Sequence, residues 1–205
     1  MTIIKDILSV IGAIASVSGA VISAAYYFHV WRWKRQLTWD DALRVAEQLL
    51  QQIEGSDWKP DIVIGLGRSG GIWGGWLAGN LGSLPLGVID VTYEETPVGG
   101  RSVAFPGGWQ VLSSLKETYP DDRNVLVVEG ASSTGQTPRE FRQELISKIP
   151  DWDVKLAVLY KNPTVAERID FVGKADLEPW PTRFPWHARA VYRPYLRDIL
   201  IPTKS

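Results

Sequence analysis

The stretch NVLVVEGASSTGQT, from Asn124 to Thr137, combines an apolar run with a small, hydroxyl-rich loop that contains glycine. The apolar run ends in Glu129, and Pro138 follows the loop. Apolar residues then recur at helical spacing as far as Ile149, which predicts a strand, a loop and a helix in succession. Because the first N–H groups of a helix lack intrahelical partners and its dipole favours negative charge, we expect this loop to bind an anion.

Composition limits the classes of protein to which the chain can belong. It has 205 residues and a formal net charge of -1, which is long enough for one buried α/β domain and carries no general signal for nucleic acid. It has no cysteine and two histidines. A disulfide framework and a cysteine-ligated metal are therefore excluded, and any metal would be held by carboxylates or phosphates.

The N-terminal part of the chain has the pattern of a membrane span. Between Ile7 and Val30 no residue carries a formal charge, apart from a contribution of His29. At about 1.5 Å per residue, this run is long enough to cross a hydrocarbon core of roughly 30 Å. The basic and aromatic sequence WRWKR follows it. We therefore predict a transmembrane helix within residues 1–35 and a cytoplasmic domain over residues 36–205, in a protein that crosses the bacterial inner membrane once.

Two other interpretations of this segment are a cleaved signal peptide and a buried core helix. A signal peptide has its basic residues before the apolar run, whereas here the basic cluster comes after it. A small-residue face along the segment permits close approach of a second helix in lipid and hence a homo-oligomer. The residues of this face are Gly12, Ser16, Ala20 and Ala24.

The remaining chain alternates between helical and strand patterns, which predicts an α/β fold with a mostly parallel sheet flanked by helices. A long loop or flap is expected over Thr92 to Gly108, and a tail along the domain edge from Lys161 onward. The expected helices cover Thr38 to Ile53, the stretch after Gly71, Trp109 to Thr118 and the stretch up to about Lys148, and the expected strands are Asp61 to Gly65, Leu86 to Val91, the stretch that begins at Asn124, and Val154 to Tyr160.

Two loops follow predicted parallel strands, where ligands bind in open α/β sheets. The first, GLGRSGG from Gly65 to Gly71, also matches the dinucleotide fingerprint GxGxxG. Asp90 stands about where a ribose-binding acid would follow in that motif. A dinucleotide-binding Rossmann-like protein is therefore one alternative, although it leaves the second loop without a role.

Taken together, the two loops resemble those of the type I phosphoribosyltransferases, nearest the bacterial xanthine/hypoxanthine or guanine branch, over roughly Thr38 to Arg189. GLGRSGG is similar to the pyrophosphate loop of that family, and VLVVEGASSTGQT to its phosphoribosyl pyrophosphate (PRPP) loop. YKNP resembles the segment whose lysine reads the purine, and EPWPTRFPW resembles the C-terminal segment whose tryptophan stacks on the base. The resemblance implies a purine-like base as acceptor and Mg²⁺ as the cofactor bound with PRPP.

The resemblance also implies roles for individual residues. Arg68 and Glu129 would act in catalysis, and Lys161 and Trp180 would bind the base. Glu129 and Asp90 are candidate metal ligands beside the substrate phosphates. The residues expected around PRPP are Arg68, Ser69, Gly70, Gly71, Glu129, Ser132, Ser133, Thr134, Gly135, Gln136 and Thr137, which supply a guanidinium fork, hydroxyls and backbone amides.

The chain departs from the family pattern at two acidic positions. Family members place two adjacent acids where this chain has Glu129 and Gly130, and a further loop acid corresponds to Ser133. A serine hydroxyl is no base at neutral pH without activation. The alternatives are therefore a membrane-anchored phosphoribosyltransferase, a catalytically altered sensor or effector that binds a nucleotide or phospho-sugar in bacterial stress or phage defence, and a structural membrane protein with vestigial loops.

Overall fold

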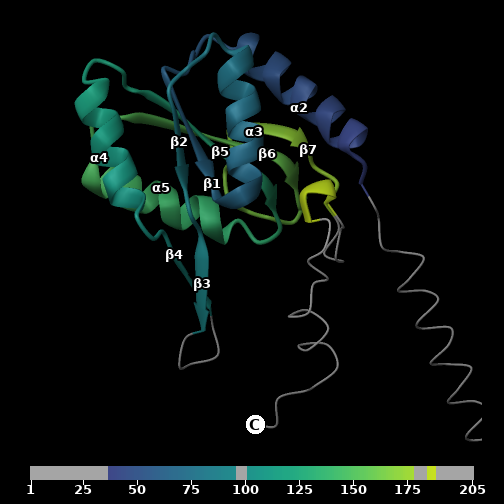
Figure 1. Cartoon of the computed structure of the whole chain (residues 1–205). Coiled ribbons are helices and arrows are strands. Elements are labelled where there is room, and N and C mark those ends of the chain that lie inside the picture. The colour runs from purple at the N-terminus through teal and green to yellow at the C-terminus, as the bar shows by residue number, and fades with distance from the viewer. Residues whose placement is uncertain (1–36, 96–100, 178–183, 188–205) are drawn as a thin grey trace, which may run out of the picture. The chain divides into compact units, whose positions relative to one another are not determined.

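The computed structural model describes residues 37–95, 101–177 and 184–187 of the chain (Figure 1). Leu37–Pro179 form one compact unit, and of the other unit only residues 184–187 are described. The elements of the compact unit are α2 (Trp39–Glu54), β1 (Ile62–Leu66), α3 (Gly67–Asn80), β2 (Leu86–Ile89), β3 (Thr92–Glu95), β4 (Arg101–Ala104), α4 (Gly108–Thr118), β5 (Asn124–Ser132), α5 (Gln136–Lys148), β6 (Asp153–Lys161) and β7 (Phe171–Lys174).

A parallel five-stranded sheet forms the centre of this unit, in the order β2-β1-β5-β6-β7. β1 is buried along its whole length, and β5 is buried from Val125 to Val128. Strands of this kind are covered on both faces, which is why they read as continuous apolar runs in the sequence. The predicted α/β fold with a mostly parallel sheet is confirmed.

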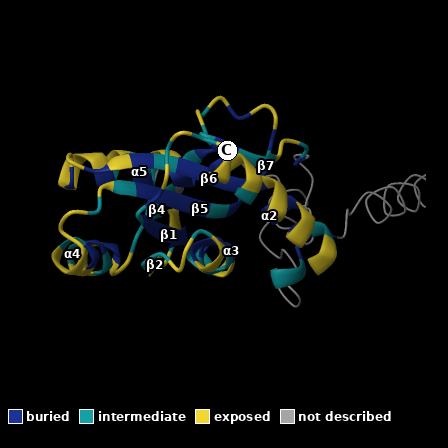
Figure 2. Cartoon of the chain, turned by 90° about the horizontal axis from the view of Figure 1, so that it is seen from above, coloured by how far each residue is buried: buried dark blue, intermediate teal, exposed yellow. Residues whose placement is uncertain are grey.

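Helices cover both faces of the sheet (Figure 2). In the view from above, α4 and α5 lie on one side of the sheet and α2 and α3 on the other. Alternate residues of the central strands pack against α4 and α5 in an apolar core. This core includes Ile62, Ile64, Leu66, Ile89, Leu112, Leu115, Val125, Val127, Phe141, Leu145, Ile149, Trp152, Val154 and Leu156.

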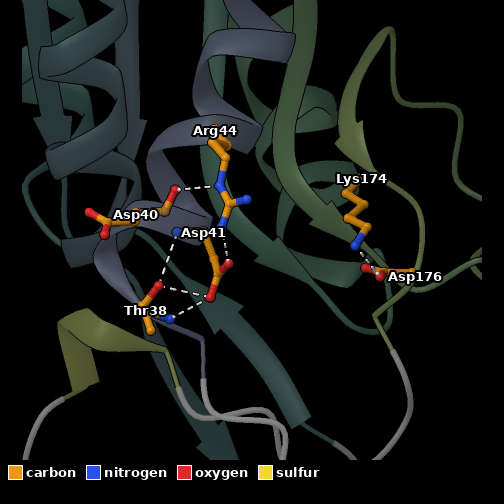
Figure 3. Close-up of polar contacts among 6 residues, drawn as sticks. All are labelled: Thr38, Asp40, Asp41, Arg44, Lys174 and Asp176. Atoms are coloured by element: carbon orange, nitrogen blue, oxygen red, sulfur yellow. Dashed lines mark hydrogen bonds and ion pairs between the residues drawn. The ribbon is translucent and has the colours of Figure 1, made fainter.

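Helix α2 begins as its sequence predicts, at a capping box (Figure 3). The Asp41 backbone N–H donates to the Thr38 hydroxyl at 3.1 Å, and the Thr38 backbone N–H donates to the Asp41 carboxylate at 3.0 Å. Arg44 pairs with the same carboxylate at 2.7 Å. Across the close-up, Lys174 at the end of β7 pairs with Asp176 at 2.8 Å. Local hydrogen bonds thus fix the entry of the chain into the domain.

The long loop expected over Thr92 to Gly108 is corrected by the structure, which forms a β-hairpin there. β3 and β4 pair antiparallel, with Tyr93 opposite Val103, and the connecting residues 96–100 lie outside the described ones. The strands are short and mostly polar, so they lack the alternation by which a strand is recognised. The two strands are stabilised by pairing with each other, and such pairing cannot be predicted from either segment alone.

Two further boundaries differ from expectation. Helix α3 already begins at Gly67, so most of the predicted glycine loop is the first turn of a helix. The region after Lys161, expected to run along the domain edge, contributes β7, which pairs parallel with β6 as an edge strand. β7 contains Gly173, which lowers its strand propensity and hid it from the sequence pattern.

The predicted membrane span and its small-residue face, Gly12, Ser16, Ala20 and Ala24, lie outside the described residues. Among the residues that the structure does describe, no helix combines the length and the apolar character needed to cross a bilayer.

Candidate functional site

The two predicted loops lie next to each other at the carboxyl edge of the sheet. β1 and β5 are neighbouring parallel strands, and their register places Gly65 opposite Val128. The first loop leaves β1 directly after this pair, and the second leaves the end of β5. A ligand beyond this edge of the sheet therefore meets both loops at once.

The first loop is held close to β5 by backbone contact. A β-carbon on Gly65 would stand 2.4 Å from the carbonyl oxygen of Gly70, and one on Gly70 would stand 2.4 Å from the carbonyl oxygen of Val128. Since real β-carbons do not approach so closely, glycine is required at both positions. Arg68 is exposed and Ser69 is half-buried in the same turn, so the guanidinium is available to an anion at this edge.

The second loop leads into the N-terminus of α5. Gly135 occupies the N-cap position with φ of 76°, in the left-handed region, and as a glycine it offers no side-chain capping bond. Ser133 and Thr134 are exposed, and the Thr134 hydroxyl accepts a hydrogen bond from the Gln136 N–H at 3.3 Å. A helix start with glycine at the N-cap, preceded by exposed hydroxyls, suits the binding of a phosphate group.

Two other hydroxyls of this loop point elsewhere. Ser132 is buried, and Thr137 is buried with its hydroxyl 3.0 Å from the hydroxyl of Tyr93 on β3. Thr137 therefore ties the hairpin to the helix, a role that the sequence did not reveal. The hydroxyl side chains of this loop that are exposed are those of Ser133 and Thr134.

Glu129 lies near the end of β5 with one carboxylate oxygen buried. Its Oε2 atom has no hydrogen-bond partner among the described residues. Burial raises the pKa of Glu129 to about 8, and the nearby Ser132 hydroxyl acts in the opposite direction. That hydroxyl forms no hydrogen bond of normal geometry. A carboxyl group with this pKa is mostly neutral at pH 7 and gains charge when a cation or a donor approaches it.

The segment after β6 reaches back to the second loop. The Lys161 ammonium is half-buried and donates to the backbone carbonyl of Glu167 at 3.1 Å. The neighbouring Asn162 is buried, and its side-chain amide donates to the carbonyl of Ser133 at 3.2 Å. Lys161 thus lies beside the loop, opposite Ser132 on the neighbouring strand. Asn162 contacts the same loop and was not among the residues predicted for the site.

Trp180 lies outside the described residues. In the same C-terminal segment a short 3-10 helix, η1, covers Pro185–His187, and the rings of Phe184 and Trp186 stack with centroids 4.7 Å apart.

The candidate metal ligands do not form a cage. Within the described ranges no three His, Asp or Glu side chains lie close enough together to hold a metal ion. Asp90 is exposed, and its carboxylate accepts a hydrogen bond from the Val91 N–H at 2.9 Å. The buried Oε2 of Glu129 has no hydrogen-bond partner among the described residues and would supply one oxygen ligand. This donor set fits a Mg²⁺ ion that is bound mainly by substrate phosphates and water, which is how proteins commonly hold that ion.

Two loops rich in glycines and hydroxyls follow neighbouring strands of a parallel sheet, at the edge where open α/β domains bind their ligands. The chain belongs to the phosphoribosyl transferase domain family, whose model matches residues 33–187. The fold implies a phosphoribosyl or nucleotide ligand. A search among curated proteins found no match.

Solved structures agree with this family. A purine phosphoribosyltransferase from Pyrococcus horikoshii is 28% identical, with a TM-score of 0.56, over 74% of this chain and 91% of that one. A hypothetical protein from Neisseria gonorrhoeae, solved with bound ppGpp, is 25% identical, with a TM-score of 0.61, over 78% and 93%. A xanthine-guanine-hypoxanthine phosphoribosyltransferase from Helicobacter pylori shares the fold at 17% identity, with a TM-score of 0.59, over 80% and 98%.

Proposed function

We propose that the protein is a membrane-anchored phosphoribosyltransferase that moves a phosphoribosyl group from PRPP to a purine-like base. The contact between the first turn of α3 and Val128 in β5 carries this proposal, because it fixes the turn that contains Arg68 against the strand that leads into the hydroxyl-rich loop. PRPP has phosphates at both ends of a ribose, so it needs two such anion sites about one sugar apart. The purine phosphoribosyltransferase from Pyrococcus horikoshii, at 28% identity, supports a purine as the acceptor.

Each group at the site has a task in this reaction. Arg68, with the amides of the following turn, binds the pyrophosphate, and Ser133 and Thr134 bind the 5-phosphate. Glu129 holds the ribose hydroxyls. The bond from C1 of the ribose to the pyrophosphate oxygen breaks, a bond from C1 to a nitrogen of the base forms, and the proton that this nitrogen carried passes to water or to the departing pyrophosphate. Arg68 stabilises the negative charge that develops on the leaving oxygen.

Other residues around the site would bind the base and the metal. Lys161 donates to a carbonyl of the purine, and Trp180 stacks on its ring. Mg²⁺, when bound with PRPP, neutralises phosphate charge, and Glu129 with Asp90 are its candidate protein ligands.

A second function is favoured by the residues that replace the usual acids. Gly130 and Ser133 supply no carboxylate, which leaves Glu129 alone to hold the ribose. A domain altered in this way can keep its phosphate sites and serve as a nucleotide sensor. The Neisseria gonorrhoeae protein that was solved with ppGpp makes a purine nucleotide with several phosphates the ligand to test for such a sensor.

One assay on the full-length protein in detergent separates these functions. Labelled PRPP with Mg²⁺ is incubated with each common purine, and binding of ppGpp is measured by calorimetry. Formation of a nucleotide supports the transferase, whereas tight ppGpp binding without turnover supports the sensor. A double variant, Arg68→Ala with Thr134→Ala, should lose both PRPP and ppGpp, so retained binding would contradict the site itself.

The dinucleotide alternative and the membrane anchor have their own tests. Binding of NAD with no affinity for PRPP or ppGpp would favour the dinucleotide alternative at Gly65 to Gly70. Membrane anchoring is tested by deleting residues 1–36. We expect the full-length chain to sediment with bacterial inner membranes, and to remain there after a salt wash, whereas the deleted form is released.

A further inference from the structure

Glu140 makes contacts on two sides of the N-terminal part of α5. Its Oε1 atom accepts a hydrogen bond from the Gln136 side chain at 2.8 Å, and its Oε2 atom accepts one from the backbone N–H of Val103 at 3.2 Å. Gln136 is the first residue of α5 and belongs to the second loop, whereas Val103 is on β4. One carboxylate therefore joins the loop to the hairpin.

The surroundings of Glu140 strengthen these bonds. Its side chain is 29% exposed, so the carboxylate is partly shielded from water. Hydrogen bonds to a charged acceptor are stronger than bonds between neutral groups. Arg139 lies 3.9 Å from the same carboxylate but is largely exposed, so this ion pair adds little.

Two further contacts join the hairpin region to the same helix. The Tyr93 hydroxyl lies 3.0 Å from that of Thr137. The rings of Phe105 and Phe141 meet edge to face, with centroids 5.0 Å apart. Figure 1 shows β4 beside the start of α5. Three contacts of different chemistry thus connect the hairpin and its exit to the first turns of α5, and the one through Glu140 also reaches a residue of the loop.

We propose that Glu140 is a positioning residue that holds the β3–β4 hairpin and the 132–137 loop in one arrangement, so that the loop is ready to receive a phosphate group. That the loop receives phosphate rests on the proposed function. The effect of Glu140 on the loop can be measured without any ligand. Glu140 is not expected to contact a reacting atom, because its two carboxylate oxygens accept hydrogen bonds from Gln136 and Val103.

The test is hydrogen exchange on the full-length protein in detergent, read by mass spectrometry for peptides over residues 101–105 and 132–137. The variant Glu140→Ala removes both bonds. Glu144→Ala is the matched control, because Glu144 lies one turn further along α5 and pairs with Lys148 rather than with the hairpin. Glu140→Gln keeps one acceptor oxygen and should recover part of the effect.

We expect Glu140→Ala to speed exchange in both peptides by about 5- to 30-fold, the loss expected from one or two net hydrogen bonds. Glu144→Ala should leave both peptides unchanged. A second substitution, Tyr93→Phe, should add less to Glu140→Ala than it causes alone, because both contacts support the same arrangement. The wild-type protein should bind PRPP, with Mg²⁺ present, about tenfold more tightly than the Glu140→Ala variant does.

Three results would overturn the inference. The first is unchanged exchange in Glu140→Ala, and the second is faster exchange in residues 101–105 alone, which would make Glu140 an anchor of the hairpin only. The third is an equal effect of Glu144→Ala. Failure of the wild-type protein to bind PRPP or ppGpp would instead contradict the proposed function, and the exchange comparison between unliganded proteins would still decide the role of Glu140.

Discussion

The carbonyl oxygen of Val128 lies 2.4 Å from the position that a β-carbon on Gly70 would occupy. This contact joins the first turn of α3 to the backbone of β5, one residue before Glu129. Because the two groups are backbone, neither can turn aside as a flexible side chain would. The distance between the Arg68 turn and the second loop is therefore set by the fold.

Substitution of Gly70 should separate the two loops. We expect Gly70→Ala to lower the free energy of unfolding by about 1 to 3 kcal/mol, because overpacking of a close contact forces the backbone to shift. Its affinity for PRPP should fall more steeply than its stability, since both phosphate sites depend on the contact. Chemical denaturation and calorimetry on the same preparation measure the two effects.

Gly79→Ala is the matched control on the same helix. A β-carbon on Gly79 meets nothing within 4 Å, and this residue lies in the last turn of α3. Alanine there should raise stability by about 0.5 to 1 kcal/mol and leave PRPP binding unchanged. If Gly70→Ala behaved like Gly79→Ala, the close contact would have no structural importance.

The pKa of Glu129 makes the stability of the domain depend on pH. In the folded protein it is about 8, above the ordinary value of 4.5. The folded state therefore binds this proton more tightly than the unfolded state does. The stabilisation is complete below about pH 4.5 and is lost as the pH rises through the folded pKa of about 8.

We expect the wild-type protein to lose several kcal/mol of stability at most, relative to Glu129→Gln, between about pH 5 and about pH 9. The glutamine variant removes the titration and keeps the shape of the side chain. Denaturation at several pH values measures the difference between the two proteins. A difference that stayed constant over this range would show that the Glu129 carboxyl titrates normally.

If Lys161 binds the base, replacing it should weaken the binding of a purine and leave the binding of PRPP nearly unchanged. Lys161→Met keeps the length of the side chain and removes the ammonium group. We expect its affinity for a purine base in the presence of PRPP and Mg²⁺ to fall about tenfold, the effect of one charged hydrogen bond, with PRPP affinity nearly unchanged. Lys155→Met on the same strand is the control, since Lys155 instead lies over the ring of Trp58. An equal loss in both variants would assign the effect to strand β6 rather than to the ammonium.

Local patterns in the sequence were enough to predict much of the fold. The start of α2 depends on the Thr38 capping box, whose members are three residues apart. β1, β5 and β6 are buried apolar runs bounded by turn residues, and such runs are recognisable on their own. The two loops of the site were found for the same reason, because glycines and hydroxyls cluster within each of them.

The parts that could not be predicted depend on residues far apart in the chain. β7 is a strand through its pairing with β6, and its Gly173 packs so closely that a β-carbon there would stand 2.6 Å from a methyl group of Val45. The Tyr93–Thr137 contact joins residues 44 apart, and the Val103–Glu140 bond joins residues 37 apart. No pattern within one segment reveals such pairs, which is why the sequence does not predict a contact between Glu140 and the hairpin.

The last prediction concerns Gly135, which begins α5 with φ of 76°. A β-carbon on Gly135 would stand 2.6 Å from Cγ1 of Val165 and 2.9 Å from Cβ of Glu167. Gly135→Ala therefore suffers backbone strain and a clash with the segment that follows Lys161. We expect a loss of about 2 to 4 kcal/mol of stability together with weaker binding of PRPP or ppGpp.

Gly107 provides the control, because it is the N-cap of α4, also has a positive φ, of 69°, and a β-carbon there meets nothing within 4 Å. Gly107→Ala should show the strain alone, about 1 kcal/mol, and bind ligand normally. The difference between the two variants isolates the packing of the second loop against the segment after Lys161. Equal stability losses with equal ligand affinities would mean that this packing does not shape the phosphate site.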